Sequence, residues 1–370
     1  MRIAIDARLS YYVQAGITQY TLNLIRALAA SDHENEYLVF QRWADRREIV
    51  SQANFRRASL LAPTHHPLEQ YLLGLDLVLL GKIDVLHSTD FIPPFHYRGA
   101  TVVTVHDLAF LLYPHFLTGR SAQYYGLIDK AVRRANHIIA VSEATKRDLV
   151  RLTGTPESKV TVIYEAAEPI YLPIHDQEVL AQVHAQYHLP EQYILFVGTI
   201  EPRKNLSTLI RAFQGLIGKY KAHADLAIVG KKGWLSDDVY ELVQDMRLTE
   251  RVHFLGRVPT EDLPHLYNAS QMLVLPSYYE GFGLPPLEAM ACGVPVIVSD
   301  ASAMPEVVGD AALRVASEDV EGFTVAMWRL LTDDSLRADM IGKGLKRVKC
   351  FSWERAARET LAVYQKVAGK

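Results

Sequence analysis

The sequence predicts an α/β protein with two domains, each a doubly wound parallel sheet covered by helices on both faces. Three observations lead to this prediction. The chain has 370 residues, which is the length of about two ordinary domains. Short apolar runs alternate with helical segments, and such runs are typical of parallel strands buried on both sides. The alternation breaks only once, near the middle.

The first half alternates between strand and helix patterns in order. The predicted strands are Ile3–Ile5, Tyr37–Phe40, Ile83–Leu86, Thr101–Val105, His137–Val141 and Val160–Tyr164. The predicted helices are Thr18–Ala30, Leu68–Leu80, Ser121–Ala135 and Ser142–Thr153. Ser142 is suited to cap the last helix, because its hydroxyl can accept a hydrogen bond from a free backbone N–H.

The alternation stops at residues 165–180, which contain two prolines and have no clean period. The predicted strands of the second half are Tyr193–Val197, Leu226–Val229, Val252–Leu255, Met272–Leu275, Val294–Val298 and Leu313–Val315. Ser352–Val367 has the pattern of an amphipathic helix. We therefore predict an N-terminal domain over residues 1–175, a C-terminal domain over 176–350, and a terminal helix over 351–370.

Composition excludes several classes of protein. Hydrophobic residues make up 49% of the chain and charged residues 22%, as in an ordinary globular protein. The net charge of -3 lacks the basic excess of a nucleic-acid-binding protein. The longest apolar stretch, Tyr71–Leu80, is too short to span a bilayer. Cys292 and Cys350 indicate neither a disulfide framework nor a zinc site. The N-terminus is too charged for a signal peptide, so we expect a cytoplasmic protein.

The segment from 273 to 300 predicts a strand, a turn and a helix. The strand ends near Pro276, the helix begins near Leu284, and Gly281 and Gly283 lie between them. Ligands of parallel sheets bind beyond the carboxyl ends of the strands. The glycines let backbone amides approach a ligand, and the free N–H groups of a helix start bind anions, so this turn is suited to a diphosphate.

Glu280 and Glu288 lie on either side of this turn. A carboxylate does not bind phosphate, but it accepts hydrogen bonds from sugar hydroxyls. The two acids therefore fit a ligand with hydroxyls on both sides of a diphosphate. The alternative interpretation is an ordinary β-loop-α turn with one solvated and one capping glutamate.

Basic residues follow two other strands of the second domain. Arg203 and Lys204 can supply a bidentate donor and a compact charge to phosphate oxygens, although each taken alone is as well explained as a solvated loop residue. Lys231 can add charge near a nucleotide, although a plain surface turn is the favoured interpretation of Val229–Trp234.

In the first domain, Gly16 opens a helix after the first strand, and His87 and His106 each stand at a strand end. A lone histidine is more often structural than functional. The D-x-D and H-E-x-x-H metal motifs, the G-x-S-x-G nucleophile motif, the dinucleotide fingerprint and the P-loop are absent from the sequence.

Glu280-Gly-Phe-Gly-Leu-Pro-Pro-Leu-Glu288 resembles the E-x7-E motif of the retaining family 4 glycosyltransferases. The resemblance continues in order through Gly16, His106, Val141–Glu143, Glu201–Asn205, Gly230–Trp234 and Phe351–Trp353. It implies the GT-B architecture, with two facing Rossmann-like domains and a C-terminal helix that returns to the first. It also implies transfer of a sugar from a nucleotide donor with retained anomeric configuration, without a metal.

The resemblance implies that Glu288 binds the ribose hydroxyls, that Glu280 binds the donor sugar, and that Lys204 with Arg203 neutralises the diphosphate. His106 would lie beside the reacting sugar. The implied catalytic residues are His106, Glu280, Lys204 and Arg203, and the implied donor-binding residues are Gly16, Thr199, Arg203, Lys204, Lys231, Val258, Glu280, Gly281, Phe282, Gly283, Leu284 and Glu288. No residue is assigned to a metal.

The chain departs from the family pattern at two positions. Thr199 stands where many relatives have an arginine, and Ala15 replaces the first of a common glycine pair. Glu201–Asn205 and Gly230–Trp234 resemble the branch that uses GDP-mannose to build polysaccharides such as O-antigen. We therefore expect GDP-mannose as co-substrate, no cofactor, and a saccharide or lipid-linked saccharide as acceptor. The alternatives are a UDP-sugar-dependent transferase and a GT-B sugar-nucleotide epimerase.

No carboxylate of the first domain is an evident nucleophile, so same-face attack by the acceptor is favoured over a covalent intermediate. A lipid-linked acceptor would bring the protein to the inner face of the membrane. Weak peripheral contact could then involve basic residues in Arg42–Arg57, although a solvated helix face is the favoured interpretation of that segment. The acceptor, the linkage and the oligomeric state stay open.

Overall fold

The computed structural model describes residues 1–12, 16–64, 66, 68–116 and 124–369, which form two compact units. Unit 1 comprises Met1–Glu165 and Ser352–Lys370, and unit 2 comprises Ala166–Phe351. The division thus falls before Ala166 rather than at residue 175. Residues 166–175 belong to unit 2 because they pack on it: the Asn268 side chain bonds the backbone of Leu172 and Ile174. The expectation for Ala15 and the start of the predicted helix Ser121–Ala135 lie outside the described residues.

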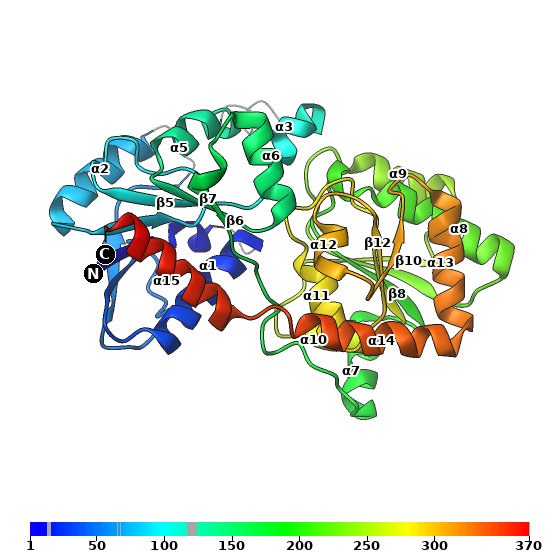
Figure 1. Ribbon diagram of the computed structural model, residues 1–370. Coiled ribbons are helices and arrows are strands. Elements are labelled where there is room, and N and C mark those ends of the chain that lie inside the picture. Colours follow the sequence, from blue (N-terminus) through cyan, green and yellow to red (C-terminus); the bar gives the residue numbers. More distant parts are fainter. Residues whose placement is uncertain (13–15, 65, 67, 117–123, 370) are drawn as a thin grey trace. The chain divides into compact units, whose positions relative to one another are not determined.

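Unit 1 contains a sheet of 7 strands in the order β3-β2-β1-β4-β5-β6-β7 (Figure 1). The sheet is parallel, as the sequence predicts. Helices α1 and α15 lie side by side on one face, and α2 and α5 cover the other. The strands are β1 (Arg2–Asp6), β2 (Glu36–Arg42), β3 (Phe55–Leu60), β4 (Val85–Ser88), β5 (Ala100–Val105), β6 (His137–Ala140) and β7 (Val160–Val162). The helices are α1 (Gly16–Ser31), α2 (Glu69–Leu80), α3 (Ala109–Leu112), α5 (Ile128–Arg134), α6 (Glu143–Thr153) and α15 (Trp353–Val367), with 3-10 turns η1 (Arg8–Tyr11), η2 (Pro114–Phe116) and η3 (Glu157–Lys159).

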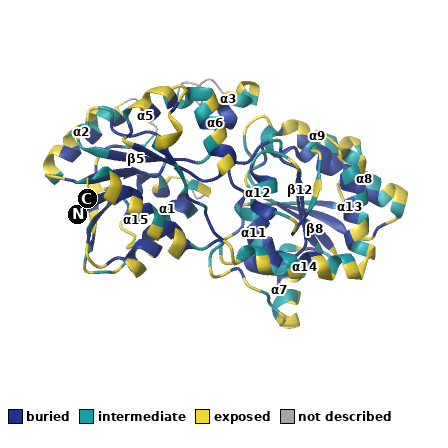
Figure 2. Cartoon of the chain, viewed as in Figure 1, coloured by how far each residue is buried: buried dark blue, intermediate teal, exposed yellow. Residues whose placement is uncertain are grey.

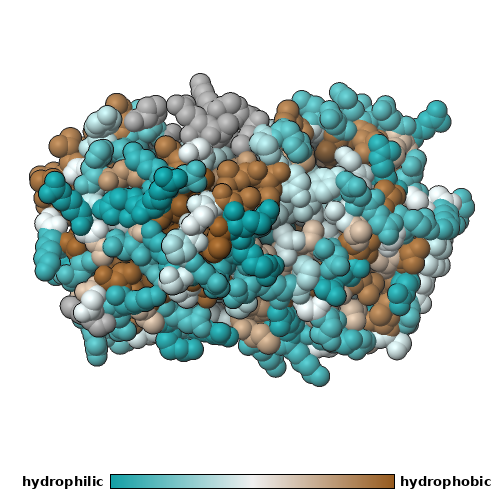
Figure 3. Space-filling view, turned by 45° about the horizontal axis from the view of Figure 1, so that its top comes forward, coloured by the Kyte–Doolittle hydropathy of each residue, from teal (hydrophilic) through white to brown (hydrophobic). Residues whose placement is uncertain are grey.

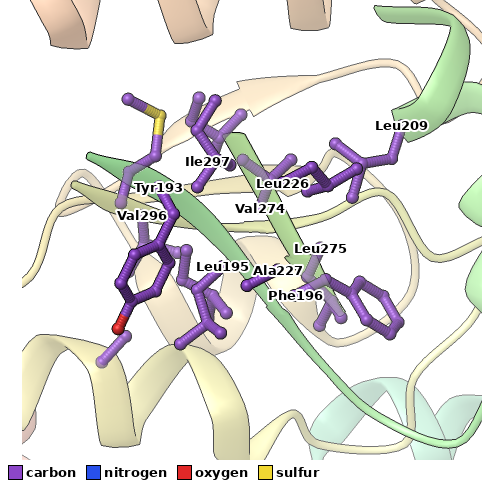
Figure 4. Close-up of a cluster of buried hydrophobic side chains, with 14 of the residues drawn as sticks. Tyr193, Leu195, Phe196, Leu209, Leu226, Ala227, Val274, Leu275, Val296 and Ile297 are labelled. Carbon is purple, nitrogen blue, oxygen red and sulfur yellow. The ribbon is translucent and has the colours of Figure 1, made fainter. Parts of the chain in front are cut away.

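Unit 2 contains a parallel sheet of 6 strands in the order β10-β9-β8-β11-β12-β13. Figure 4 shows side chains of its central strands meeting Leu209 of a covering helix in one apolar core. The strands are β8 (Tyr193–Val197), β9 (Asp225–Val229), β10 (Val252–Gly256), β11 (Met272–Leu275), β12 (Val296–Ser299) and β13 (Leu313–Val315). The helices are α7 (Gln177–Tyr187), α8 (Leu206–Tyr220), α9 (Asp237–Asp245), α10 (Leu263–Ala269), α11 (Leu284–Ala291), α12 (Met304–Val308), α13 (Val320–Thr332) and α14 (Asp334–Val348), with the 3-10 turn η4 (Pro202–Lys204).

Strand β3 is absent from the sequence prediction. It forms the edge of the unit 1 sheet, where it pairs in parallel with β2. Arg56 and Arg57 are exposed, so the segment does not read as an apolar run. Charged residues on an edge strand discourage pairing with another chain. The helix-face interpretation of Arg42–Arg57 is therefore wrong, because this range contains the end of β2, a connecting segment and the start of β3 but no helix.

Helix α15 is joined to the sheet of unit 1 by buried polar contacts. His87 Nδ1 lies 2.6 Å from the Tyr364 hydroxyl of α15, and His87 Nε2 lies 2.8 Å from the Thr104 hydroxyl. Burial and, to a smaller extent, the charge of His106 lower the pKa of His87 to about 3, so the ring is neutral. His87 is thus a structural residue that connects β4 to the last helix. Among the described helices, none has the length and apolarity to cross a bilayer.

The contact between Tyr364 and His87 can be tested by Tyr364→Phe, which removes only the hydroxyl. We expect the free energy of unfolding to fall by about 1–3 kcal/mol, because a buried nitrogen of His87 loses its partner. Urea denaturation measures this loss. Tyr11→Phe, at a side chain that is 45% exposed, serves as the control and should leave the midpoint unchanged. Equal denaturation midpoints for both variants would show that the contact between His87 and Tyr364 does not stabilise the fold.

Candidate active site

The order of strands brings the predicted site residues of unit 2 together. The chain runs outward from β8 through β9 to β10 and then crosses back, so β11 lies directly beside β8. The loops that follow β8 and β11 therefore diverge from neighbouring positions at the carboxyl edge of the sheet. Such a switch point is where ligands of open α/β sheets bind. Arg203 and Lys204 come from the first loop and Glu280 from the second.

Glu280 is the centre of a buried ion-pair cluster. Its Oε1 accepts hydrogen bonds of 2.6 Å from Lys204 Nζ and 2.6 Å from the Ser277 hydroxyl. Its Oε2 accepts a bond of 2.9 Å from Arg203 Nη1. Arg203 also pairs at 2.8 Å with Glu201, a residue that the sequence analysis quoted without giving it a role. The predicted residues Arg203, Lys204 and Glu280 thus lie in direct contact.

The electrostatics of this cluster keep Glu280 ionised. Its side chain is buried, and burial alone would raise the pKa of a carboxyl. The charges of Lys204 and Arg203 outweigh burial and lower the pKa of Glu280 to about 2. Each cation is already matched by a carboxylate, since Glu201 and Glu280 balance Arg203 and Lys204. In this arrangement Glu280 orients the two cations, and its lone pairs are largely taken by protein donors.

The turn before α11 can be formed only with glycine at one position. Gly283 has φ 111°, and a Cβ on it would lie 2.3 Å from Met304 Cε. Phe282 is buried and its ring meets that of Phe351 edge-on at 5.7 Å. Gly281 is buried as well, and Leu284 begins the helix. The backbone of the predicted phosphate turn is therefore held in one conformation by packing.

Glu288 is placed one turn into α11 and is partly exposed. Its Oε2 accepts a hydrogen bond of 2.7 Å from the Tyr267 hydroxyl of α10. Burial, and then the charge of Glu288, raise the pKa values of both Tyr267 and Tyr171. Both phenols therefore stay protonated and able to donate. Neither tyrosine was identified from the sequence, because Tyr171 stands in the segment without a clean period and Tyr267 stands in a helical segment between two predicted strands.

The remaining predicted residues of unit 2 have simpler surroundings. Thr199 follows Gly198 at the end of β8, and a Cβ on Gly230 would lie 1.8 Å from the Gly198 carbonyl oxygen. The backbones after β8 and β9 thus touch, which explains the glycine at position 230. Lys231 is exposed, whereas Val258 is buried with the apolar core of unit 2.

His106 of unit 1 follows β5 and has a hydrogen-bond acceptor at each ring nitrogen. Nδ1 lies 3.2 Å from Glu165 Oε1, and Nε2 lies 2.8 Å from the backbone oxygen of Thr89. Burial alone would lower the pKa of His106, but the hydrogen bond and the charge of Glu165 outweigh it and raise the pKa. Both nitrogens can donate at once only in the imidazolium, so this site favours a charged His106.

Glu165 was missed as a site residue because it stands at the start of the segment without period. The signal was its position: it follows β7, at the same carboxyl edge of the sheet as His106. Gly16, the other predicted residue of unit 1, begins α1. A Cβ on Gly16 would meet no atom of the described residues within 4 Å, so packing does not require glycine there.

Among the described residues, no group of three or more His, Cys, Asp or Glu side chains is arranged to hold a metal ion. The carboxylates of Glu280 and Glu165 are instead paired with basic side chains or hydroxyls of the protein.

Comparison with known proteins gives consistent matches along the chain. The family model "Glycosyltransferase Family 4" matches residues 15–169, and "Glycosyl transferases group 1" matches residues 182–347. The chain is 33% identical to O-antigen chain mannosyltransferase B of Escherichia coli, over 96% of this chain and 97% of that protein. It is 28% identical to O-antigen chain mannosyltransferase RfbU of Salmonella typhimurium, over 84% and 86%. Sucrose-phosphate synthase from Thermosynechococcus elongatus has a similar fold, with a TM-score of 0.81, 23% identity and coverage of 99% and 98%.

Glu165→Gln tests whether this carboxylate sets the charge of His106. We expect the pKa of His106 to fall, because burial then acts with less opposition. Titration of the ring followed by NMR measures the pKa directly. Glu157→Gln, on a side chain that is 75% exposed, is the matched control. An unchanged pKa of His106 in the Glu165 variant would show that this carboxylate does not stabilise the protonated ring.

Glu280→Gln tests the central ion pairs of unit 2. Removing the charge takes the paired carboxylate away from the buried Lys204 ammonium, while Arg203 keeps Glu201, so we expect a loss of roughly 3–5 kcal/mol in stability near neutral pH. Because the pKa of Glu280 is lowered from 4.5 to about 2, its contribution is complete above pH 4.5 and is lost as the pH falls towards 2. The variant should therefore lose less stability than the wild type over that interval.

Urea denaturation from neutral pH down to about pH 2 measures both the stability lost by the variant near neutral pH and the pH dependence of stability in the two proteins. Glu321→Gln, which removes the exposed partner of Lys219, should have little effect at any pH. A Glu280 variant as stable as this control would refute the role of the cluster.

Proposed function

This chain belongs to the family 4 glycosyltransferases, is a hexosyltransferase and has the GT-B fold, and from this premise we propose that it transfers mannose from GDP-mannose to a growing bacterial surface polysaccharide. The acceptor in this proposal is a saccharide or lipid-linked saccharide of the O-antigen type, and the reaction takes place in the cytoplasm. The observation that carries the proposal is the 33% identity with an O-antigen chain mannosyltransferase over nearly the whole of both chains.

The site of unit 2 supports a diphosphate-linked donor. The rigid turn at Gly281–Gly283 presents backbone amides at the start of α11, and Arg203 and Lys204 lie on the neighbouring loop. Glu288, held by Tyr267, has the acceptor oxygens that ribose hydroxyls require. Because Glu280 already bonds both cations, we propose that it fixes their positions and offers its remaining lone pair to the sugar.

We further propose retention of configuration by same-face attack, without a divalent ion. The bond between the anomeric carbon and the phosphate oxygen breaks, and the acceptor oxygen forms its bond on the same face. The acceptor proton passes to the leaving phosphate. Lys204, Arg203 and the turn amides stabilise the charge that develops on the diphosphate, as preorganised dipoles and cations do in other active sites. The imidazolium of His106 would donate rather than accept a proton.

A UDP-sugar transferase and a nucleotide-sugar epimerase are the competing functions. Calorimetric titration should give tighter binding of GDP than of UDP. Lys204→Ala and Glu288→Ala should each weaken GDP binding by tenfold or more, because each removes a charged hydrogen bond worth about 1.5–3 kcal/mol. Lys349→Ala and Glu241→Ala, at exposed positions of unit 2, are the matched controls. Tighter binding of UDP would overturn the donor assignment.

Incubation with GDP-mannose distinguishes the reaction classes. Without acceptor, an epimerase would convert the nucleotide sugar, whereas the proposed transferase should leave its sugar configuration unchanged. With a mannose-terminated oligosaccharide, the product should have the α-configuration of the donor, and its rate should persist in EDTA. Activity that disappears in EDTA and returns with a divalent ion would refute the metal-free mechanism.

A further inference from the structure

An ordinary surface helix buries its apolar side chains and exposes its charged ones, whereas α2 buries its acidic side chains and exposes apolar ones. Its acidic residues point inward: Glu69 accepts a hydrogen bond of 3.0 Å from buried Arg8, and Asp76 accepts bonds of 3.0 and 3.1 Å from the amides of Leu61 and Ala62. The exposed residues of the helix and its N-cap are all apolar. They are Leu68, Tyr71, Leu75, Val78 and Leu79, with exposed fractions of 53%, 71%, 65%, 79% and 86%, and we call them the α2 face.

These residues recur at helical spacing, so the α2 face is one continuous apolar stripe rather than scattered single side chains. Contiguous exposed apolar surface marks a site of interaction. Figure 3 shows hydrophobic side chains along the edge of unit 1 where α2 lies. The partner must therefore offer apolar surface.

A cationic pocket of about 520 Å³ lies next to α2. It is lined by Phe95, Gly126, Asp129, Lys130, Arg133 and Arg134. Phe95 N–H donates a hydrogen bond of 2.8 Å to Gln70 Oε1 in the first turn of α2, which holds the pocket against that helix. Lys130 Nζ lies 4.2 Å from the centre of the Phe95 ring. Within the described part of the chain, its three cations form no ion pair with a carboxylate.

The α2 face and the pocket point in the same direction. Both α2 and α5, which carries Lys130, Arg133 and Arg134, cover the same face of the sheet (Figure 1). Figure 2 shows the exposed sides of both helices turned away from that sheet. A single flat surface can therefore contact both.

We propose that unit 1 docks on an anionic lipid surface, with the α2 face inserted at the boundary between headgroups and acyl chains and the cationic pocket occupied by acidic headgroups. An apolar helix face beside a pocket with three basic residues and one acidic residue has the chemistry of such interfacial binding. The charges favour lipid over a second copy of the chain. A symmetric contact sets the same patch against itself and would bring two cationic pockets together. The inference does not rest on the sugar transferred.

The test is co-sedimentation of the full chain with vesicles of phosphatidylcholine, either pure or with one phosphatidylglycerol for every three phosphatidylcholines. We expect binding to the mixed vesicles that is at least tenfold tighter and weakens with added salt. Leu75→Gln with Leu79→Gln should weaken it by tenfold or more, because less apolar surface leaves water. Lys130→Gln with Arg133→Gln should reduce it to the level seen with pure phosphatidylcholine.

The matched charge control is Arg26→Gln with Arg358→Gln, exposed residues of α1 and α15 on the opposite face of the sheet. Leu172→Gln, a 51% exposed position of unit 2, is the apolar control. Both should bind like the wild type, and thermal denaturation establishes that every variant is folded. Equal binding by all variants would overturn the proposal. So would a dimer in solution that the α2 variants dissociate while vesicle binding stays unchanged, since the face would then be an interface between copies.

Discussion

The ionised carboxylate of Glu280 is the constraint on which the functional part of unit 2 depends. It joins two loops that leave neighbouring strands and would otherwise separate, because Lys204 and Arg203 belong to one loop and Glu280 to the other. The same contact fixes the start of the glycine turn and the direction of both cations. Removing a buried charge from such a cluster costs more than the pair contributes, so the three residues act as one unit. The positions at which a donor phosphate would find positive charge are thereby set before it binds.

Unit 1 shows a comparable arrangement around His106. Its ring is held between Glu165 and a carbonyl oxygen, and it meets the ring of Tyr20 edge-on at 4.8 Å. The Tyr20 hydroxyl lies 3.0 Å from Thr104, which bonds His87, which bonds Tyr364 of α15. A continuous series of buried contacts, one between aromatic rings and three hydrogen bonds, therefore runs from the candidate catalytic residue to the last helix. The pKa values of these two histidines are shifted in opposite directions, because burial dominates at His87 whereas the Glu165 carboxylate outweighs burial at His106.

The fold was predictable because the buried strands read as apolar runs. The contact of Arg203 and Lys204 with Glu280 could be anticipated because all three residues follow strand ends of one sheet. The features that the sequence did not predict were missed for local reasons. Strand β3 lies at a sheet edge and carries two exposed arginines, so no apolar run marks it. Glu165 and Tyr267 act through contacts with residues distant in the sequence, and spacing does not report such contacts. The mutual neutralisation of Lys204 and Glu280 likewise required the strand order, which places β8 beside β11.

The return of α15 makes unit 1 discontinuous, since Met1–Glu165 is completed only by Ser352–Lys370. A ribosome releases the beginning of the polypeptide long before its end. While unit 2 is being translated, the nascent unit 1 has α1 and the His87 side of its sheet without the helix that covers them. Its core therefore closes last, although it is synthesised first. A chain that ends before Ser352 lacks α15 and therefore keeps the surface of α1 that this helix covers exposed to water.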